Sequence, residues 1–233
     1  MCHYRRQAKN YSKLFLMETK LVIFDLDGTL LNTVKDLGMA TNYALKQCGY
    51  PERAEEEFNF LCGRGIINMF KGAMPPEEVN EENVQEMKDL FLPYYDAHKS
   101  DYTRPYPGIP ELLLALKERG IRMGVASNKY QDGAEKLVAG FFPEISFVKI
   151  LGQREGQPIK PDPAIVDQIM AQVEGISKEN VVYCGDTNTD MQTGINAGVK
   201  TVGVTWGFRS REELEAYHPW LMADTPEQIL ENI

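Results

Sequence analysis

The chain has 233 residues, of which 43 % are hydrophobic and 25 % are charged, enough for one sizeable core and a smaller second unit. Its net charge of −9 argues against a nucleic-acid partner, because a strongly acidic surface repels a polyanion. No apolar run approaches the roughly 20 residues that span a bilayer, so we expect no membrane association.

The cysteines are widely scattered along the chain. They are Cys2, Cys48, Cys62 and Cys184, and none of them belongs to a C-x-x-C pair. This pattern is typical of reduced thiols, so we expect a cytoplasmic protein without disulfides. The three histidines form no cluster either, which gives no indication of a zinc site.

Residues 1–16 differ from the rest of the chain. They are basic at first, and their apolar stretch is too short for a secretory signal. Met17 stands just before the first strand-like run. We therefore expect residues 1–16 to be a disordered leader or the product of an upstream start codon, and the fold prediction leaves them out.

From residue 17 onward, short apolar runs alternate with helical patterns. The runs have the near-continuous apolar character of strands buried on both faces. They cover residues 21–24, 121–126, 147–150, 181–184 and 201–204. Helical periodicity is found at residues 109–119, 132–139, 163–173 and 190–197, and again after Thr225. This alternation predicts an α/β fold with a Rossmann-like parallel sheet core and helices on both faces.

Residues 33–103 interrupt the alternation. They contain no good strand, but they hold helical stretches at 35–47 and 81–92 that are rich in Glu, Met and Lys. The Pro-Tyr-Pro-Gly sequence at 105–108 marks the return to the sheet. We therefore expect a core of residues 17–32 and 104–233, with an inserted helical cap domain at 33–103.

Three predicted strands end in polar residues suited to phosphate chemistry, namely Asp25, Ser127 and Asp186. In open parallel sheets, ligands bind beyond the carboxyl ends of the strands, so these side chains should meet in one crevice. Carboxylates without histidine or thiolate partners favour Mg²⁺ as the cofactor. The sequence therefore predicts a magnesium site between Asp25 and Asp186.

The first of these strands continues into the sequence Asp-Leu-Asp-Gly-Thr. Asp25 and Asp27 can both face the crevice, and Gly28 permits a turn that brings backbone N–H groups toward an anion. A plain polar turn after a strand is the alternative interpretation.

The other motifs supply a helix start and phosphate ligands. Asp190 can act near the metal, as the N-cap of the helix that follows, or as both. Ser127 and Asn128 can hold phosphoryl oxygens, and the Lys160 ammonium can neutralise charge that builds up during transfer. Prolines at 161 and 163 fix the backbone beside Lys160, although a solvated surface lysine is the alternative.

Taken together, these residues resemble the four motifs of the haloacid dehalogenase superfamily. The matching segments are 25–30, 127–128, 160–163 and 185–190, in the family's order, and the insertion site resembles that of members with a helical cap. The resemblance covers residues 20–233. Within the superfamily the chain looks most like the phosphoglycolate phosphatase branch, on segments 106–108, 196–199 and 204–208. One departure is Asn32, where the family commonly has aspartate.

The resemblance implies a phosphatase of a small phosphate monoester, with 2-phosphoglycolate as first candidate. Asp25 would attack phosphorus and form an aspartyl-phosphate, and Asp27 would serve as acid and then base. Mg²⁺ would be held by the Asp25 side chain, the Asp27 backbone carbonyl and Asp186. Asp190 would orient this metal shell, while Ser127 and Lys160 would clamp the transferring group.

The inserted helices contain one candidate substrate loop, Gly63-Arg64-Gly65. Arg64 could meet a substrate carboxylate, although a surface turn with a solvated arginine fits the sequence equally well. Lys71 is a weaker candidate.

Other functions remain open. A phosphatase of a sugar phosphate, a nucleotide or pyrophosphate would use the same core, as would a phosphomutase. Asp27 argues against a dehalogenase, which the family implies does not use this carboxylate. A phospho-acceptor signalling receiver also combines aspartates, Mg²⁺, a hydroxyl and a lysine, but it needs no lid and no leaving-group acid. The intact Asp25, Lys160 and Asp186 argue against a non-catalytic binding module. Nothing in the sequence indicates an oligomeric state.

Overall fold

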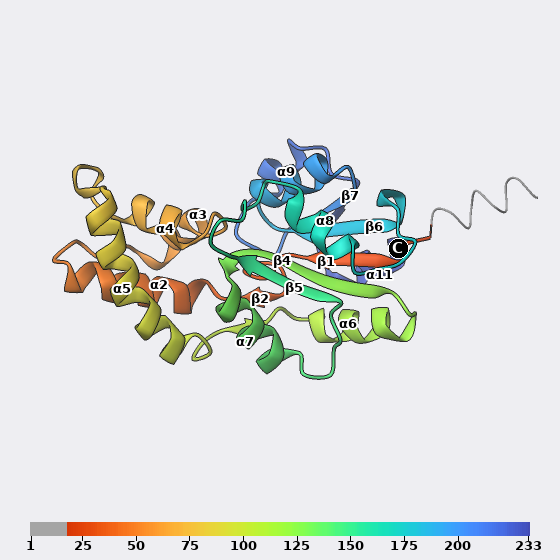
Figure 1. Ribbon diagram of the computed structural model, residues 1–233, viewed down its shortest axis with the longest axis horizontal. Coiled ribbons are helices and arrows are strands. Elements are labelled where there is room, and N and C mark those ends of the chain that lie inside the picture. The colour runs from red at the N-terminus through yellow and green to blue at the C-terminus, as the bar shows by residue number, and fades with distance from the viewer. Residues whose placement is uncertain (1–17) are drawn as a thin grey trace, which may run out of the picture.

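A six-stranded sheet forms the centre of the computed structural model, which describes residues 18–233 (Figure 1). The strand order is β5-β4-β1-β6-β7-β8, and every neighbouring pair is parallel. The strands are β1 (Leu21–Phe24), β4 (Arg122–Tyr130), β5 (Lys149–Gln153), β6 (Val181–Gly185), β7 (Lys200–Val204) and β8 (Leu221–Ala223). The predicted α/β fold is confirmed, whereas the predicted leader at 1–16 lies outside the described residues.

The central strand β1 shows why its sequence is apolar throughout. It pairs with β4 on one side and β6 on the other, and its four residues are fully buried. Val22 and Phe24 belong to one hydrophobic cluster, whereas Leu21 and Ile23 belong to another. Successive strand residues point to opposite faces, so both faces of the sheet are covered.

Helices cover each face of this sheet. On the face of Val22 and Phe24, the hydrophobic cluster includes residues of α6 (Ile109–Glu118), α7 (Gln131–Phe141) and α11 (Pro226–Asn232). On the opposite face it includes residues of α8 (Ala164–Met170) and the end of α9 (Asn188–Ala197). A short helix, α10 (Arg211–Glu215), follows β7. The helices on both faces agree with the predicted architecture.

Two details differ from the sequence prediction. The strand expected at 121–126 continues as β4 to Tyr130, with a shift in its register against β5 after Ala126. Ser127, Asn128 and Lys129 therefore lie within an irregular strand end and not in a loop. The edge strand β8 was not predicted, because it is only three residues long and partly exposed.

The segment between β2 (Leu31–Asn32) and β3 (Arg104–Pro105) is helical, and these two strands pair antiparallel at its base. Its helices are α2 (Val34–Gln47), α3 (Phe58–Leu61), α4 (Ile66–Ala73) and α5 (Glu81–His98), with the 3-10 turns η1 (Glu55–Glu57) and η2 (Pro76–Glu78). They pack around a hydrophobic cluster of their own and lie to one side of the sheet domain (Figure 1). We call residues 33–103 the helical insertion.

The base of the helical insertion is fixed by one buried carboxylate. Asp36, in the first turn of α2, accepts hydrogen bonds from the backbone N–H groups of Tyr102 and Thr103 and from the Thr103 hydroxyl. The outgoing and returning chain segments are therefore joined where the insertion meets the sheet domain.

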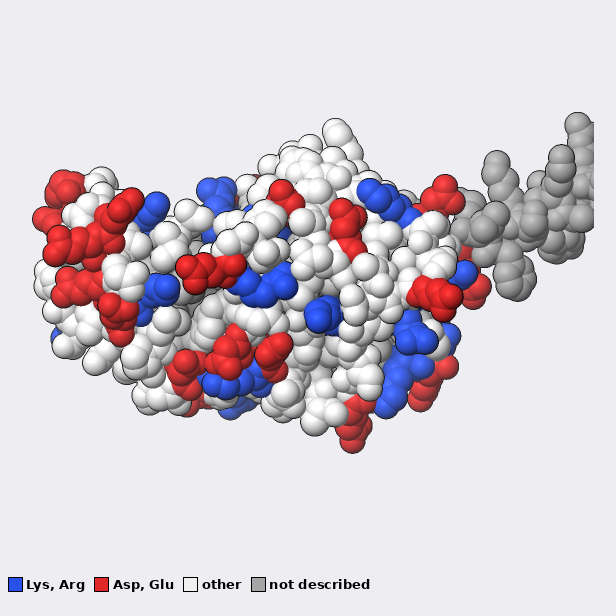
Figure 2. All heavy atoms as spheres, in the orientation of Figure 1, with Lys and Arg blue, Asp and Glu red and all other residues white. Residues whose placement is uncertain are grey.

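Acidic side chains gather at the far end of the helical insertion (Figure 2). They include Glu77 and Glu78 of η2 and Glu81 and Glu82 of α5. Within residues 18–233, no helix combines the length and the apolar character that crossing a bilayer requires.

Candidate active site

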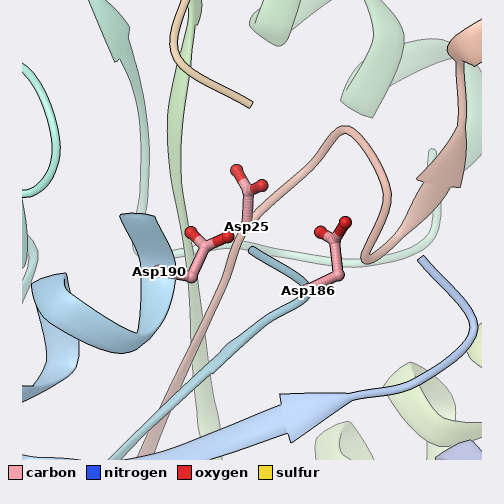
Figure 3. Close-up of side chains that lie close together, drawn as sticks. All are labelled: Asp25, Asp186 and Asp190. Carbon is pink, nitrogen blue, oxygen red and sulfur yellow. The ribbon is translucent and has the colours of Figure 1, made fainter. Parts of the chain in front are cut away.

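Three buried carboxylates meet beyond the carboxyl ends of β1 and β6. Asp25 follows β1, Asp186 follows β6, and Asp190 lies in the first turn of α9. One carboxylate oxygen from each residue lies within 4.8 Å of the others. The side chains project from neighbouring elements toward the same space (Figure 3). Because β1 and β6 are adjacent parallel strands, residues about 160 positions apart in sequence come together here.

The turn after β1 is shaped around Asp186. Gly28 has a φ of +97°, and a Cβ atom at this position would lie 2.2 Å from Oδ2 of Asp186. The Thr29 hydroxyl donates to Oδ1 of Asp186 at 2.8 Å, and the Phe208 N–H donates to Oδ2 at 2.8 Å. A glycine is therefore required where the loop crosses the carboxylate.

Asp190 starts α9 and also holds Lys160. Its Oδ2 accepts from the backbone N–H and the hydroxyl of Thr187, while the Thr187 hydroxyl accepts from the Asp190 N–H. This is a capping box. Oδ1 of Asp190 accepts from Lys160 Nζ at 2.7 Å and from the Tyr183 hydroxyl at 2.9 Å. Both oxygens of Asp190 thus have partners within the protein.

Lys160 is buried, with only 2 % of its surface exposed, so the alternative of a solvated surface lysine is wrong. Its Nζ lies 2.8 Å from Oδ1 of Asp25, 2.7 Å from Oδ1 of Asp190 and 3.2 Å from the Tyr183 hydroxyl. The ammonium therefore bridges the carboxylate at the end of β1 and the carboxylate of α9.

Asn128 holds the backbone of Lys160 in place. Its Oδ1 accepts from the Lys160 N–H at 2.9 Å, and its Nδ2 donates to the carbonyls of Lys160 and Gly63. The sequence predicts a phosphate ligand at Asn128, whereas the side-chain amide is engaged here in fixing Lys160 and the edge of the helical insertion. Ser127 is also buried, and its Oγ accepts from the Lys129 N–H.

Burial and the repulsion between neighbouring carboxylates have the largest effects on the pKa values of Asp25 and Asp186. Burial raises the pKa of Asp25 from 3.8 to about 7, with repulsion from Asp190 adding to the effect and Lys160 opposing it. Burial also raises the pKa of Asp186 well above its usual value. For Lys160, burial lowers the pKa, but attraction to Asp190 and Asp25 outweighs burial and the net shift is upward. Asp25 and Asp190 therefore share one cation, Lys160, while Asp186 has no cation beside it among the described ion pairs.

This donor set fits a magnesium ion. Asp25 and Asp186 offer hard carboxylate oxygens, which Mg²⁺ prefers to nitrogen or sulfur ligands, whereas both oxygens of Asp190 are engaged within the protein. A divalent cation would also offset the negative charge that burial makes costly.

A cavity lies between the sheet domain and the helical insertion. The sheet domain contributes Asp25, Asp27, Ser127, Asn128 and Lys129 to its lining. The helical insertion contributes Leu37, Cys62, Gly63, Gly65, Ile66 and Met69. The cavity thus has polar groups on one side and a largely apolar wall on the other.

Lys129 is a residue of this cavity that the sequence analysis missed. It is 4 % exposed, and its Nζ lies 2.9 Å and 3.3 Å from the two carboxylate oxygens of Asp27. The same Nζ lies 4.7 Å from the ring centroid of Tyr95, which is buried in α5. Its position directly after Ser127-Asn128, at the end of an apolar strand, was a signal that could have identified it.

The two cations expected on the helical insertion do not line this cavity. Arg64 is exposed and lines a different cavity with Asn68, Asn188 and Tyr217, among others. Lys71 is exposed on α4.

Residues 206–209 connect Asp186 with the helical insertion. Trp206 donates its indole N–H to the Thr29 carbonyl, and the Phe208 N–H reaches Asp186. The Phe208 side chain belongs to the hydrophobic cluster of the insertion. Arg209, which is buried, donates to the carbonyls of Asn59, Phe60 and Cys62 at the end of α3. The sequence does not predict this role for them.

The chain matches the family model of haloacid dehalogenase-like hydrolases over residues 22–204, and it belongs to this family. The resemblance stated from the motifs is thereby confirmed, and the chain is a hydrolase.

Known relatives point within the family to one branch. The phosphoglycolate phosphatase of Haemophilus influenzae is 30 % identical over 212 residues, which cover 88 % of this chain and 94 % of that protein. The phosphoglycolate phosphatase of Aquifex aeolicus is 30 % identical over 194 residues, covering 81 % and 86 %. A crystal structure of a candidate phosphoglycolate phosphatase from Lactobacillus delbrueckii subsp. bulgaricus superposes with a TM-score of 0.85 at 32 % identity, covering 93 % of this chain and 98 % of that one.

Proposed function

We propose that this chain is a Mg²⁺-dependent phosphatase that hydrolyses a small phosphate monoester through an aspartyl-phosphate on Asp25. 2-Phosphoglycolate is the first candidate substrate, since similar proteins with this name align over most of the chain. The observation that carries the proposal is the meeting of Asp25, Asp186 and Asp190 within 4.8 Å, next to Lys160.

Asp25, the backbone carbonyl of Asp27 and Asp186 would hold Mg²⁺, with Asp190 orienting the site through Lys160. The ion would offset the charge of the carboxylates and of an anionic phosphate, which otherwise repel each other. Asp25 would be ionised in this state, since the positive charge favours its anionic form.

The side chains divide the reaction into two steps. Asp25 attacks phosphorus, the bond from phosphorus to the ester oxygen breaks, and Asp27 gives its proton to the departing alkoxide. Asp27 then takes a proton from water, which attacks the aspartyl-phosphate and releases inorganic phosphate. Ser127 holds the transferring group, and Lys160 fixes Asp25 and neutralises charge beside it.

Residues 33–103 would act as a cap over this chemistry. Support comes from the apolar residues that the helical insertion contributes to the cavity, because such a wall excludes water from the reacting groups. Residues 17–32 and 104–233 would be the catalytic core. We also propose a cytoplasmic location, which the free thiols of Cys48, Cys62 and Cys184 support.

The proposal is tested by phosphate release. Wild-type protein with Mg²⁺ is assayed on 2-phosphoglycolate, sugar phosphates, nucleotides and pyrophosphate, and we expect the highest kcat/KM for 2-phosphoglycolate. Asp25→Asn should abolish turnover, because the amide is a poor nucleophile, while circular dichroism remains unchanged. Activity retained by Asp25→Asn, or full activity in EDTA, would contradict the assignment. A stable phosphoprotein without turnover would favour a signalling receiver.

A further inference from the structure

We propose that Lys129 recognises the leaving group, and that the preferred substrates are phosphate monoesters whose alcohol carries an anion. This inference rests on the proposed function and specifies its substrate class. The free carboxylate of 2-phosphoglycolate is one such anion.

The position of Lys129 follows from its contact with Asp27. In the proposed reaction, the Asp27 carboxylate must reach the ester oxygen of the leaving group. Lys129 Nζ lies 2.9 Å from Oδ1 of Asp27, so it stands beside the leaving group. Lys160 instead contacts the nucleophile Asp25. The two buried lysines therefore serve opposite ends of the ester.

The hydrogen-bond capacity of the two lysines differs. An ammonium group has three donors, and Lys160 has three oxygen partners, on Asp25, Asp190 and Tyr183. Lys129 contacts the oxygens of the single Asp27 carboxylate and the face of the Tyr95 ring. It can therefore offer a donor to a ligand oxygen while Asp27 and Tyr95 keep its ammonium in place.

The rest of the cavity makes Lys129 the point where an anion can bind. Among the described residues that line this cavity, Lys129 is the only cation. The helical insertion presents Leu37, Ile66 and Met69 to the same space. A carboxylate left without a partner against these apolar groups would be strongly disfavoured, whereas one at Lys129 forms a charge-assisted hydrogen bond.

The test compares 2-phosphoglycolate with 2-hydroxyethyl phosphate, an ester of similar size without the carboxylate. Lys129→Met should lower kcat/KM for 2-phosphoglycolate at least roughly tenfold more than for 2-hydroxyethyl phosphate. Only 2-phosphoglycolate has a carboxylate that forms a charged hydrogen bond with Lys129, so only this ester loses that bond in the variant. The loss shared by both esters measures what Lys129 does through Asp27. Lys136→Met, which removes the same charge from an exposed position on α7, should lower neither value.

Binding is measured separately from turnover. In Asp25→Asn, calorimetry reports the affinity for both esters, and adding Lys129→Met should weaken the binding of 2-phosphoglycolate selectively. Lys129→Gln keeps a hydrogen-bond donor but removes the charge. It replaces Lys129→Met in both measurements if Lys129→Met does not fold.

Two outcomes would overturn the assignment. Equal losses for both esters in the Lys129 variants would show that Lys129 acts only on Asp27. If Arg64→Met selectively lowered kcat/KM for 2-phosphoglycolate and Lys129→Met did not, the leaving group would be recognised by the helical insertion and not by Lys129. Failure of the wild type to hydrolyse any ester with Mg²⁺ would instead contradict the proposed function, and the calorimetric comparison would still decide the role of Lys129.

Discussion

Gly28 is one of the glycines of the candidate active site whose backbone leaves no room for a side chain. A Cβ atom would lie 2.2 Å from Oδ2 of Asp186, in a backbone conformation with a φ of +97°. We expect Gly28→Ala to displace Asp186 from Asp25 and to abolish most Mg²⁺-dependent turnover. Urea unfolding should show a loss of free energy from backbone strain, about 1–2 kcal/mol, and a further loss of roughly 1–3 kcal/mol from overpacking.

Gly49 provides the matched control for this substitution. Its φ is +79°, and no heavy atom lies within 4 Å of the Cβ that it would carry. Gly49→Ala should therefore lower the free energy of unfolding by the backbone strain alone, about 1–2 kcal/mol, and leave kcat/KM unchanged. Equal losses of stability and activity in the two variants would show that the approach of Gly28 to Asp186 is unimportant.

At the scale of single residues, site residues could be predicted from the sequence where a side chain suited to catalysis directly follows a predicted strand. Asp25 and Asp186 each follow a short apolar run, and adjacent parallel strands had to bring them together. The partners of Asn128 could not be deduced in this way, because its contacts with Gly63 and Lys160 depend on how three separate segments pack. Lys129 was missed because the strand was expected to end before it.

At the scale of elements, residues 206–209 between β7 and α10 link the helical insertion to Asp186. Phe208 holds Asp186 through its backbone N–H, and the next residue, Arg209, holds α3 through its guanidinium. The carbonyls at the end of a helix lack partners within the helix, so a buried guanidinium there satisfies several at once. The position of the helical insertion and the orientation of Asp186 should therefore depend on each other.

Arg209→Met tests this link. Loss of the guanidinium leaves the carbonyls of Asn59, Phe60 and Cys62 without this partner, so we expect the end of α3 to separate from residues 206–209 more often. Hydrogen exchange should quicken in residues 57–63, and KM should rise by roughly tenfold or more, in line with the loss of a hydrogen bond to a charged group. The affinity for Mg²⁺, followed by the fluorescence of Trp206 in a Trp220→Phe background, should fall as well.

Arg211, two residues further along, is the control. It is partly exposed on α10 and pairs with Glu215 and Asp224. Arg211→Met should change the free energy of unfolding by less than about 1 kcal/mol and leave KM and exchange unchanged, since surface ion pairs contribute little. Normal exchange and normal Mg²⁺ affinity in Arg209→Met would exclude a coupling role for the segment.

For the whole molecule, periodicity was enough to predict the layered α/β architecture. Strands buried on both faces need near-continuous apolar runs, and β1, β6 and β7 have them. Periodicity could not predict how the helical insertion packs on the sheet domain. This packing depends on the polar residues Arg209, Asn128 and Asp36, whose partners lie more than 60 positions away in the sequence. Hydrophobic patterns place elements in layers, whereas buried polar contacts set their final arrangement.

The buried carboxylates give the whole molecule a pH-dependent stability. Burial raises the pKa of Asp25 from 3.8 to about 7, and it raises that of Asp186 as well. The folded state therefore holds these protons at pH values at which the unfolded chain has lost them. The stability that the protonated carboxyl groups contribute is lost as the pH rises through the folded-state pKa. In EDTA, we expect this contribution to the free energy of unfolding to decrease between about pH 4 and pH 7.

Saturating Mg²⁺ should remove this decrease. In the proposed site the ion would bind the ionised carboxylates of the folded state, so its stabilising effect should grow as the pH rises, by RT ln(1 + [Mg²⁺]/Kd) at each pH. Urea unfolding of the wild type at several pH values, in EDTA and in Mg²⁺, measures both slopes, and Asp25→Asn should flatten the EDTA slope and lose most of the Mg²⁺ effect. If wild type and variant kept the same slopes with and without the ion, the shared charge of residues 25 and 186 would not control folding, and the magnesium site would have to lie elsewhere.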